Sequence, residues 1–558
     1  MMQALGGRLR RTRLTSAASS PALPGLASGG TGESPARLAV LDSPNAVTGD
    51  RPASAPADSA TTQEARRLYL AVRSPLAVVL GVQAALSLRL IWSNTAFQDE
   101  GLYLRAGHLE WAGWLHGVAV PDFPSYFSGA PVVYPPIGAL ADSLGGLAAA
   151  RILALCFMLG VTALLWSTTV RLYGRRAALL ASGLFATLAG TQFLGAFATY
   201  DPMALFLLAL AVWLGVRSVD CGARMRSVLL IATGVSLVLA NAAQYATALF
   251  APILLIILAT ATWRRQGGRI AIKATIAVVG SWLVLMAIVI HVAGHQYWVG
   301  ITTSTLHRAP SSVAAAVIFQ RAYVWMSLIL VLAALGAVLA IRSGERGRFL
   351  PAVLAAAALL MPVEQARLHT TLSLQKHVVF GAWFAAIAAG YAMARLSRID
   401  PGRGWAAVMA IPILASTLFG SLGQAAALYS VWPSSSALIH VLRSEVRAHP
   451  GEYLAEDFDV EAYYLRDEVP WQRWASTYYF TYEGDPAGAM SYDAAIQNHY
   501  FSLIILDFGD TSGTDRQIVA DMSHTSGYHE LTQVGRFIIW GLADPGRSTG
   551  GGGQHVVN

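Results

Sequence analysis

Long apolar runs dominate the chain between residues 75 and 428 and set its fold class. A helix needs about 20 mostly apolar residues to cross the hydrocarbon core of a bilayer. Eleven runs approach that length: 75–93, 134–170, 177–197, 202–217, 227–243, 245–262, 274–291, 323–341, 349–363, 378–394 and 405–428. The second run is too long for one crossing, so we expect its first part to be a surface-lying or re-entrant helix. The pattern predicts a polytopic α-helical membrane protein with about eleven transmembrane helices.

The composition agrees with this fold class. Of the 558 residues, 55% are hydrophobic and only 13% are charged, against roughly 25% charged residues in typical soluble proteins. All but two of the 39 basic residues are arginine, and the formal net charge is +7. A nucleic-acid-binding protein would gather such cations on one soluble face. Here they lie in short loops between apolar runs, so we expect the lipid bilayer, and no nucleic acid, as a partner.

Every second loop between the runs is basic. The five basic loops, 171–176, 217–226, 264–273, 342–348 and 395–403, hold 16 arginines and lysines against three acids. Because basic loops tend to stay in the cytoplasm, this alternation places all five there, and Arg66, Arg67 and Arg73 place the N-terminus on the same side. The sequence therefore predicts a multi-pass protein of the cytoplasmic membrane. The loop 94–133 then lies outside the cytoplasm, as does the chain from Tyr429 onward.

The two ends of the chain differ from its middle. Residues 1–65 are rich in Ala, Gly, Ser, Pro and Arg and predict a disordered cytoplasmic tail, whereas 66–428 form the transmembrane domain. From 429 the sequence becomes acidic and rich in tyrosine. We expect a small extracytoplasmic α/β domain over 429–545 and a flexible tail over 546–558. The expected helices of the α/β domain are 434–451 and 515–525, and its expected buried strands are 500–509 and 535–542.

Two adjacent carboxylates, Asp99 and Glu100, follow the first apolar run and open the 94–133 loop. One interpretation is structural, because acidic residues at a helix start satisfy free backbone N–H groups and complement the helix dipole. Leu102, Ala106 and Leu109 recur after the pair at helical spacing, so an interfacial helix capped by Asp99 explains it. The other interpretation is that the two carboxylates carry chemistry at the membrane surface.

Further charged residues are expected at the same membrane surface. Arg151 lies near or inside a span, where a charge costs roughly 3 kcal/mol on insertion scales and normally faces a partner or a wet cavity. Asp201 stands at an outer span end, where it either caps a helix before Pro202 or contributes to a site. A third segment adds the basic residues Arg367, His369, Lys376 and His377, which are either snorkelling cations or site residues. Their joint arrangement favours a site.

Several short motifs also resemble a known enzyme family. The stretches "DEGLYLRAGHLEWAG", "YPPIGAL", "AARILAL", "RLYGRR" and "TYDPMALFLLALAVWL" resemble membrane glycosyltransferases of the GT-C type over about 75–400. The most similar are bacterial enzymes of family 39, the protein O-mannosyltransferase and aminoarabinose-transferase-like group. The resemblance implies transfer of a sugar from a polyprenyl-phosphate donor to an acceptor outside the cytoplasm (a cell-envelope glycan, lipid or protein), usually with inversion.

The resemblance also implies roles for individual residues. Asp99 and Glu100 match an acidic pair in the first outer loop, whose first member is regarded as the base, so 94–133 is implied to be the catalytic loop. Arg151 matches an arginine near the carrier phosphate. Asp201 matches a second acid found in several relatives, and Lys376 matches a cation before a late span.

Tyr134 departs from the family pattern. Relatives carry Lys or His before the two prolines, where this chain has Tyr134. A neutral phenol cannot compensate a phosphate charge, so this substrate-binding position is expected to alter the choice of sugar or acceptor.

The expected mechanism needs a base and a set of cations. The donor phosphate leaves as an anion, so cations aimed at its oxygens suffice, and Arg151 and Lys376 are the candidates, with Arg367 and His377 behind them. Asp99 takes the proton of the acceptor hydroxyl, and a single displacement then inverts the anomeric carbon. Glu100 either orients the acceptor or raises the basicity of Asp99. No cofactor is expected, although a divalent metal bridging acids and phosphate is an alternative.

Two other function classes stay open at this point. A transporter or flippase of a lipid-linked saccharide also places charges inside a membrane domain. A non-catalytic protein that binds cell-wall glycan through the aromatic segment 473–485 is the other alternative. Only an enzyme would release free polyprenyl phosphate from a polyprenyl-phosphate sugar.

Overall fold

The computed structural model describes residues 74–308, 310–344, 347–397, 405–456, 458–485 and 487–543. The predictions for the tails 1–65 and 546–558, for Arg66, Arg67 and Arg73, and for part of the last basic loop lie outside these residues.

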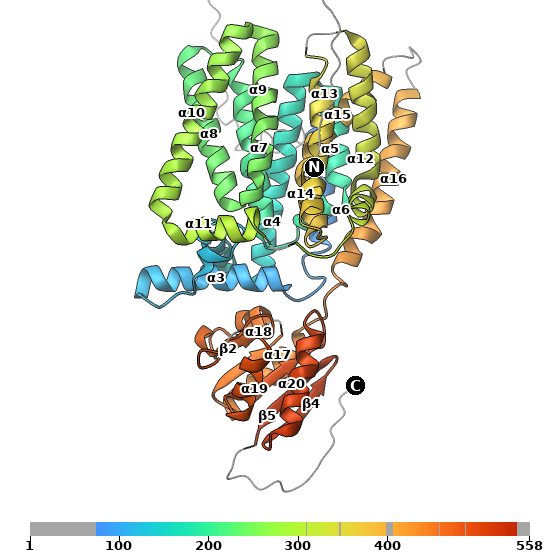
Figure 1. Ribbon diagram of the computed structural model, residues 1–558. Helices are drawn as coiled ribbons and strands as arrows, with labels where there is room; N and C mark the ends of the chain where they lie inside the picture. Colours follow the sequence, from blue (N-terminus) through green and yellow to red (C-terminus); the bar gives the residue numbers. More distant parts are fainter. Residues whose placement is uncertain are drawn as a thin grey trace, which may run out of the picture. The chain divides into compact units, whose positions relative to one another are not determined.

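The first part of the described chain is helical (Figure 1). Its elements are α2 (Pro75–Leu88), α3 (Gln98–His116), η1 (Phe123–Ser125), α4 (Pro135–Tyr173), α5 (Arg175–Thr187), α6 (Ala189–Leu194), α7 (Tyr200–Ser218), α8 (Ala223–Ala243), η2 (Tyr245–Phe250), α9 (Ala251–Gln266), α10 (Gly268–Ala293), α11 (His295–Ile301), η3 (Thr302–Leu306), α12 (Ala315–Ser343), α13 (Leu350–Ala356), η4 (Ala357–Leu359), α14 (Leu360–Arg367), α15 (Leu374–Leu396) and α16 (Trp405–Leu428). Each of the eleven predicted apolar runs coincides for most of its length with one of these helices or with consecutive ones.

Eight helical segments of the described chain are long and apolar enough to cross a membrane, which makes the protein a multi-pass membrane protein. They are α4, α7, α8, η2 with α9, α10, α12, α13 to α14, and α15. Two shorter apolar helices, Pro75–Leu88 and Pro412–Leu428, add to them. The remaining predicted run forms α5 and α6, which are separated at Leu188.

The long second run bends, in agreement with the expectation that it is more than a single crossing. Within α4, Gly145 and Gly146 leave the helical conformation, and Gly146 has a φ of 65°. Such a positive φ is open to glycine at little energetic penalty. The segment that begins at Pro135 is therefore set off from the segment that carries Arg151.

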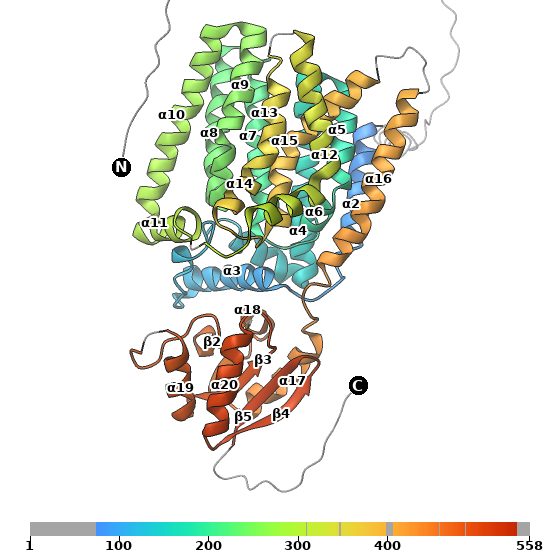
Figure 2. The same ribbon diagram turned by 45° about the vertical axis from the view of Figure 1, so that its right-hand side comes forward.

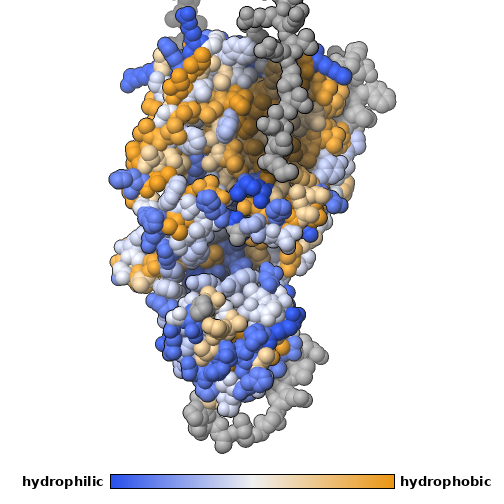
Figure 3. Space-filling model, viewed as in Figure 1, coloured by the Kyte–Doolittle hydropathy of each residue, from blue (hydrophilic) through white to orange (hydrophobic). Residues whose placement is uncertain are grey.

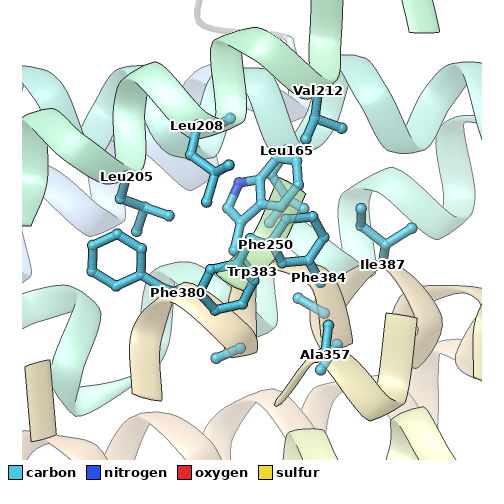
Figure 4. Close-up of a cluster of buried hydrophobic side chains, with 14 of the residues drawn as sticks. Leu165, Leu205, Leu208, Val212, Phe250, Ala357, Phe380, Trp383, Phe384 and Ile387 are labelled. Carbon is cyan, nitrogen blue, oxygen red and sulfur yellow. The ribbon is translucent and has the colours of Figure 1, made fainter. Parts of the chain in front are cut away.

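Helix α15 is the centre of the bundle. In its apolar stretch 89% of the residues are buried in the protein, against 6% for α10. Trp383, Phe380 and Phe384 of α15 pack with Phe250, whose ring stacks on Phe384 at a centroid distance of 5.4 Å (Figure 4). Small residues permit close helix contacts here, because a Cβ at Gly390 would lie 2.4 Å from the carbonyl oxygen of Ala177 in α5.

Four of the basic loops meet at one end of the bundle, which we call the basic end. Arg265 forms an ion pair with Asp220 and donates to the carbonyl oxygen of Arg171 at 3.1 Å, which joins the first three basic loops. A Cβ at Gly347 would lie 3.0 Å from Arg264 Cδ, so the fourth basic loop adjoins them. Helix α3 lies across the opposite end, the α3 end (Figures 1 and 2). Which end faces the cytoplasm stays a prediction.

The last part of the described chain forms a five-stranded mixed sheet with helices, which we call the sheet domain. Its elements are α17 (Ser436–Ala448), β1 (Glu452–Ala455), α18 (Phe458–Tyr464), η5 (Trp471–Arg473), β2 (Trp474–Ser476), α19 (Ala489–Gln497), β3 (Phe501–Leu506), α20 (Ser512–His524), β4 (Tyr528–Val534) and β5 (Phe537–Leu542). The strand order is β2-β1-β3-β5-β4, with β1 parallel to β2 and β3, and β5 antiparallel to β3 and β4. The helices and strands expected here from the sequence are confirmed.

Both faces of this sheet are covered. On one face Leu503 and Ile505 of β3 pack with Leu438 and Leu442 of α17, and on the other Ile504 packs with residues of α19 and α20. In the face shown, apolar residues cover much of the bundle, whereas polar residues dominate the sheet domain (Figure 3). The contrast is that of a lipid-facing part and a water-facing part.

Candidate active site

The acidic pair opens α3, but its two carboxylates do different things. Phe97 is the N-cap residue, and Glu100, three positions later, accepts a hydrogen bond from the backbone N–H of Phe97 at 3.1 Å. The predicted helix is therefore present, whereas the capping role expected for Asp99 belongs to Glu100. This leaves the carboxylate of Asp99 available for other partners.

Glu100 and Arg151 form a fully buried ion pair. Arg151 Nε donates to Glu100 Oε1 at 2.8 Å and its Nη2 donates to Oε2 at 2.6 Å, which is a two-point contact. The backbone N–H of Ala198 also donates to Oε1 at 2.8 Å. The remaining guanidinium donors reach the carbonyl oxygens of Ile91, Asn94 and Thr95. The pair thus ties α3 to α4 and to the segment before α7. Whether Arg151 binds a phosphate stays a prediction.

Lys376 lies between two carboxylates at the α3 end. Its ammonium donates to Asp99 Oδ2 at 2.5 Å and lies 3.8 Å from Asp201 Oδ2. Lys376 is 4% exposed and Asp201 is fully buried, whereas the side chain of Asp99 is 26% exposed. Three segments far apart in the sequence therefore meet here, and Asp99 is the member that can be reached from outside.

Asp201 is held by several groups around this lysine. Gln244 Nε2 donates to its Oδ1 at 3.0 Å, and Thr199 Oγ1 donates to its Oδ2 at 2.9 Å. His377 Nε2 lies 3.9 Å from Oδ1, and its other ring nitrogen lies 3.0 Å from Gln365 Nε2. The structure thus brings the predicted residues Asp99, Asp201, Lys376 and His377 together.

Tyr134 lies in a buried aromatic cluster beside this group. It is fully buried and packs with Tyr103, Tyr200 and Phe123. Its hydroxyl has no hydrogen-bond partner among the residues that the structure describes, and the same is true of Gln244 Oε1. Buried polar atoms of this kind are usually paired with protein, water or ligand. The substrate-binding role expected for Tyr134 stays a prediction.

Arg367 and His369 have other partners. Arg367 forms an ion pair with Glu364 on the same helix at 2.5 Å, and it donates to the carbonyl oxygens of Thr305 and Leu306. Its side chain is 48% exposed. His369 lies against the carbonyl oxygen of Val313. Within the described residues, neither side chain forms a hydrogen bond or ion pair with Lys376, Asp99 or Asp201.

Three residues of the site did not stand out in the sequence: Gln244, Thr199 and Gln365. Gln244 stands near the start of an apolar run, where an amide inside membrane depth is itself a signal of a buried polar contact. Thr199 precedes Asp201 by two residues, which is a spacing that permits a local side-chain hydrogen bond.

An acidic cluster occurs in the sheet domain, away from these residues in sequence. Carboxylate oxygens of Glu456, Asp507 and Asp515 lie within 4.8 Å of one another, which is compatible with a metal ion. Glu456 already accepts hydrogen bonds from the backbone N–H groups of Gly509 and Thr511. The expectation that the reaction uses no metal stays a prediction.

Comparisons with known proteins give the fold a name. No protein-family model matches the chain, and no curated protein is similar to it in sequence. ArnT from Cupriavidus metallidurans bound to undecaprenyl phosphate shares 14% identity at a TM-score of 0.56, covering 84% of this chain and 98% of that one. An oligosaccharyltransferase of Archaeoglobus fulgidus, in complex with Zn and sulfate, shares 14% identity at a TM-score of 0.53, covering 84% of this chain and 73% of that one. The chain has the GT-C membrane fold. This confirms the resemblance seen in the sequence at the level of the fold.

The same fold holds for further solved structures. ArnT in its apo state covers 87% of this chain and all of its own at a TM-score of 0.55. The archaeal oligosaccharyltransferase AglB, in complex with an inhibitory peptide and a dolichol-phosphate, covers 84% of this chain and 74% of its own at a TM-score of 0.54.

Proposed function

We propose that the protein is a membrane glycosyltransferase that moves a sugar from a polyprenyl-phosphate donor to an acceptor outside the cytoplasm, with Asp99 as the base. The observation that carries this proposal is the buried Lys376 held between Asp99 and Asp201 at the α3 end. The fold shared with ArnT and AglB, whose structures hold undecaprenyl phosphate and dolichol-phosphate, supports a lipid-linked donor.

The charges of this group suit the two halves of the reaction. Lys376 has three N–H donors, and Asp99 is the one hydrogen-bond acceptor recorded for them in the described chain. An oxygen of the donor phosphate can therefore accept a hydrogen bond from another of these N–H groups. A cation placed in a water-poor site stabilises the leaving phosphate strongly. Two carboxylates facing one ammonium leave a negative charge in excess, which suits the acceptance of a proton.

Asp99 is the better placed of the two carboxylates to be the base. Its side chain is partly exposed, whereas Glu100 is fully buried and bound by Arg151 and two backbone N–H groups. We therefore assign Glu100 and Arg151 to holding the start of α3 in place. A single base on the acceptor side gives one displacement and inversion at the anomeric carbon.

The remaining predicted residues and boundaries form part of the proposal. Tyr134 and Asp201 line the donor or acceptor site with His377 behind Lys376, and Arg367 contacts substrate outside this group. The basic end faces the cytoplasm, so the loop 94–133 and the domain over 429–545 lie outside it. The acceptor is a cell-envelope glycan, lipid or protein.

The test uses the full chain purified in lipid nanodiscs and given radiolabelled polyprenyl-phosphate sugars with an envelope extract as acceptor. Release of free polyprenyl phosphate together with a labelled acceptor is expected. Asp99→Asn should lower the rate by about 10²–10⁴-fold, the usual contribution of a general base. Asp122→Asn is the matched control, since Asp122 is an exposed acid of the same loop. Near wild-type transfer by Asp99→Asn would contradict the assignment.

A further inference from the structure

Helix α18 of the sheet domain lies directly against α3, beside the acidic pair. A Cβ added at Gly101 would lie 2.7 Å from the carbonyl oxygen of Asp459 and 3.3 Å from Val460 Cα. Gly101 follows Glu100 in the first turns of α3. The two backbones therefore touch one residue beyond the pair, at a distance that leaves no room for a side chain.

A buried ion pair joins the same two helices. Arg105 of α3 donates to the carboxylate of Asp459, and their side chains are 5% and 11% exposed. The Arg105 guanidinium also lies 4.9 Å from the ring of Phe458. Burial raises the pKa of Asp459, the positive charge of Arg105 opposes this shift, and the negative charge of Asp99 adds to it.

Two consecutive tyrosines of α18 hold the surroundings of α3. The backbone N–H of Ala96 donates to the hydroxyl of Tyr464 at 2.9 Å, just before α3 begins. The hydroxyl of Tyr463 donates to Asp142 Oδ1 at 2.5 Å, and Asp142 Oδ2 lies 2.7 Å from His108 Nε2 of α3. Contacts from α18 therefore hold Ala96, two residues before α3, and the first turns of α3, and through Asp142 of α4 they reach its middle.

We propose that α18 positions Asp99, with Asp459, Tyr463 and Tyr464 as positioning residues that fix the first turns of α3. The sheet domain is then part of the catalytic apparatus and not a separate glycan-binding module. This inference rests on the proposed function of Asp99 as the base. It matters for the rate because a displacement of about 1 Å at a reacting group can lower the rate about 10²-fold.

The first test is Asp459→Asn in the full chain, with Arg536→Gln as the matched control. Arg536 pairs with Asp507 in the same domain, so the control also removes an ion pair of the sheet domain but leaves α18 in place. Asp459→Asn should lower kcat by about 10-fold with the donor KM unchanged, because donor binding depends on Lys376 and not on α18. Amide hydrogen exchange over residues 97–106 should rise. The control should change neither quantity.

A merely structural role for Asp459 gives a different result. It would lower the yield or melting temperature and leave the kcat of the folded protein and the exchange of α3 at wild-type values, which would overturn the proposal. A loss of kcat in Arg536→Gln as large as in Asp459→Asn would overturn it as well.

The second test is Gly101→Ala. Alanine favours helix more than glycine does, so the change should be neutral or stabilising if α18 were not seated on α3. Here the methyl group must push α18 away, and we expect the same fall in kcat and the same rise in exchange over 97–106. A fully active, fully protected Gly101→Ala variant would overturn the proposal. If the wild-type chain transfers no sugar at all, the proposed function fails, while hydrogen exchange still decides whether α18 fixes α3.

Discussion

The two ends of the helical bundle hold charges in contrasting surroundings. At the basic end, Arg265 is 50% exposed and pairs with Asp220, which is 27% exposed, across neighbouring loops. At the α3 end, Arg151 and Lys376 are 0% and 4% exposed and pair with acids far away in the sequence. Exposed pairs contribute little to stability, whereas a buried charge must be fully compensated. The comparison teaches that burial, and not the number of charges, distinguishes the α3 end from the basic end.

The largest effect is expected from breaking the buried pair of Glu100 and Arg151. Arg151→Met leaves Glu100 buried with only backbone N–H donors, and such a change typically costs about 3–5 kcal/mol. We expect a large fall in the free energy of unfolding in detergent, measured by denaturant titration. The double variant Arg151→Met with Glu100→Gln removes both charges and should recover part of the loss. Unchanged stability in Arg151→Met would mean that the buried ion pair at the α3 end contributes no more to stability than the exposed pair at the basic end.

The next effect concerns Lys376. Lys376→Met removes the cation that faces Asp99 and Asp201, and loss of one electrostatic stabiliser typically lowers the rate by about 10²–10³-fold. The fall should appear in kcat/KM for the lipid-linked donor, measured in nanodiscs. Lys376→Arg keeps the charge and serves as the comparison. An unchanged donor requirement in Lys376→Met would argue against a role in binding phosphate.

An intermediate effect is expected from Asp507 in the sheet domain. Burial, together with the neighbouring Glu456, raises the pKa of Asp507 to about 6, and Arg536 opposes the shift. The unfolded value is about 3.9, so this group's stability contribution is complete below about pH 4 and is lost as the pH rises through about 6. The shift corresponds to at most about 3 kcal/mol, and solvent screening of this partly exposed group reduces the loss.

This pH dependence is measured by following hydrogen exchange of β3 and β5 in the full chain. Asp507→Asn should flatten the profile between about pH 4 and pH 7. A profile of the variant that still falls with rising pH would assign the titration to another group of the domain.

The smallest effect is expected at the basic end. Arg265→Gln removes one partner of an exposed ion pair, which is worth about 0–1 kcal/mol. Stability should change by no more than this, and sugar transfer should stay at the wild-type rate. A tenfold or greater loss of transfer would show that the basic end takes part in the reaction and would remove the contrast between the two ends.

The sequence predicted the helical fold well because apolar length is a local property. All eleven runs are helical for most of their length, and the glycines at 145 and 146 break the long second run. The sheet domain could be predicted for the same reason, since the buried strand Phe501–Leu506 is a mostly apolar segment bounded by turns.

The pairing of charged residues was harder to predict from the sequence. Arg151 was expected to face a partner, but nothing in the sequence tells that this partner is Glu100, 51 residues earlier. Gln244 lies in an apolar stretch and only the folded chain brings it to Asp201. Likewise, the packing of α18 against α3 at Gly101 joins residues more than 350 positions apart in the sequence. No local sequence pattern predicts such a contact.

The enclosure of α15 has a consequence for how the proposed lipid donor is admitted. Close packing around most of this helix, with Trp383 donating to the carbonyl oxygen of Val161 at 3.2 Å in its middle, opposes sliding or tilting of the helix. Lys376 lies in the first turn of that helix and is consequently held in place by the packing of the bundle. For the proposed lipid donor, the widening that admits a prenyl chain comes from the perimeter of the bundle, where Thr302–Leu306 has no buried residue.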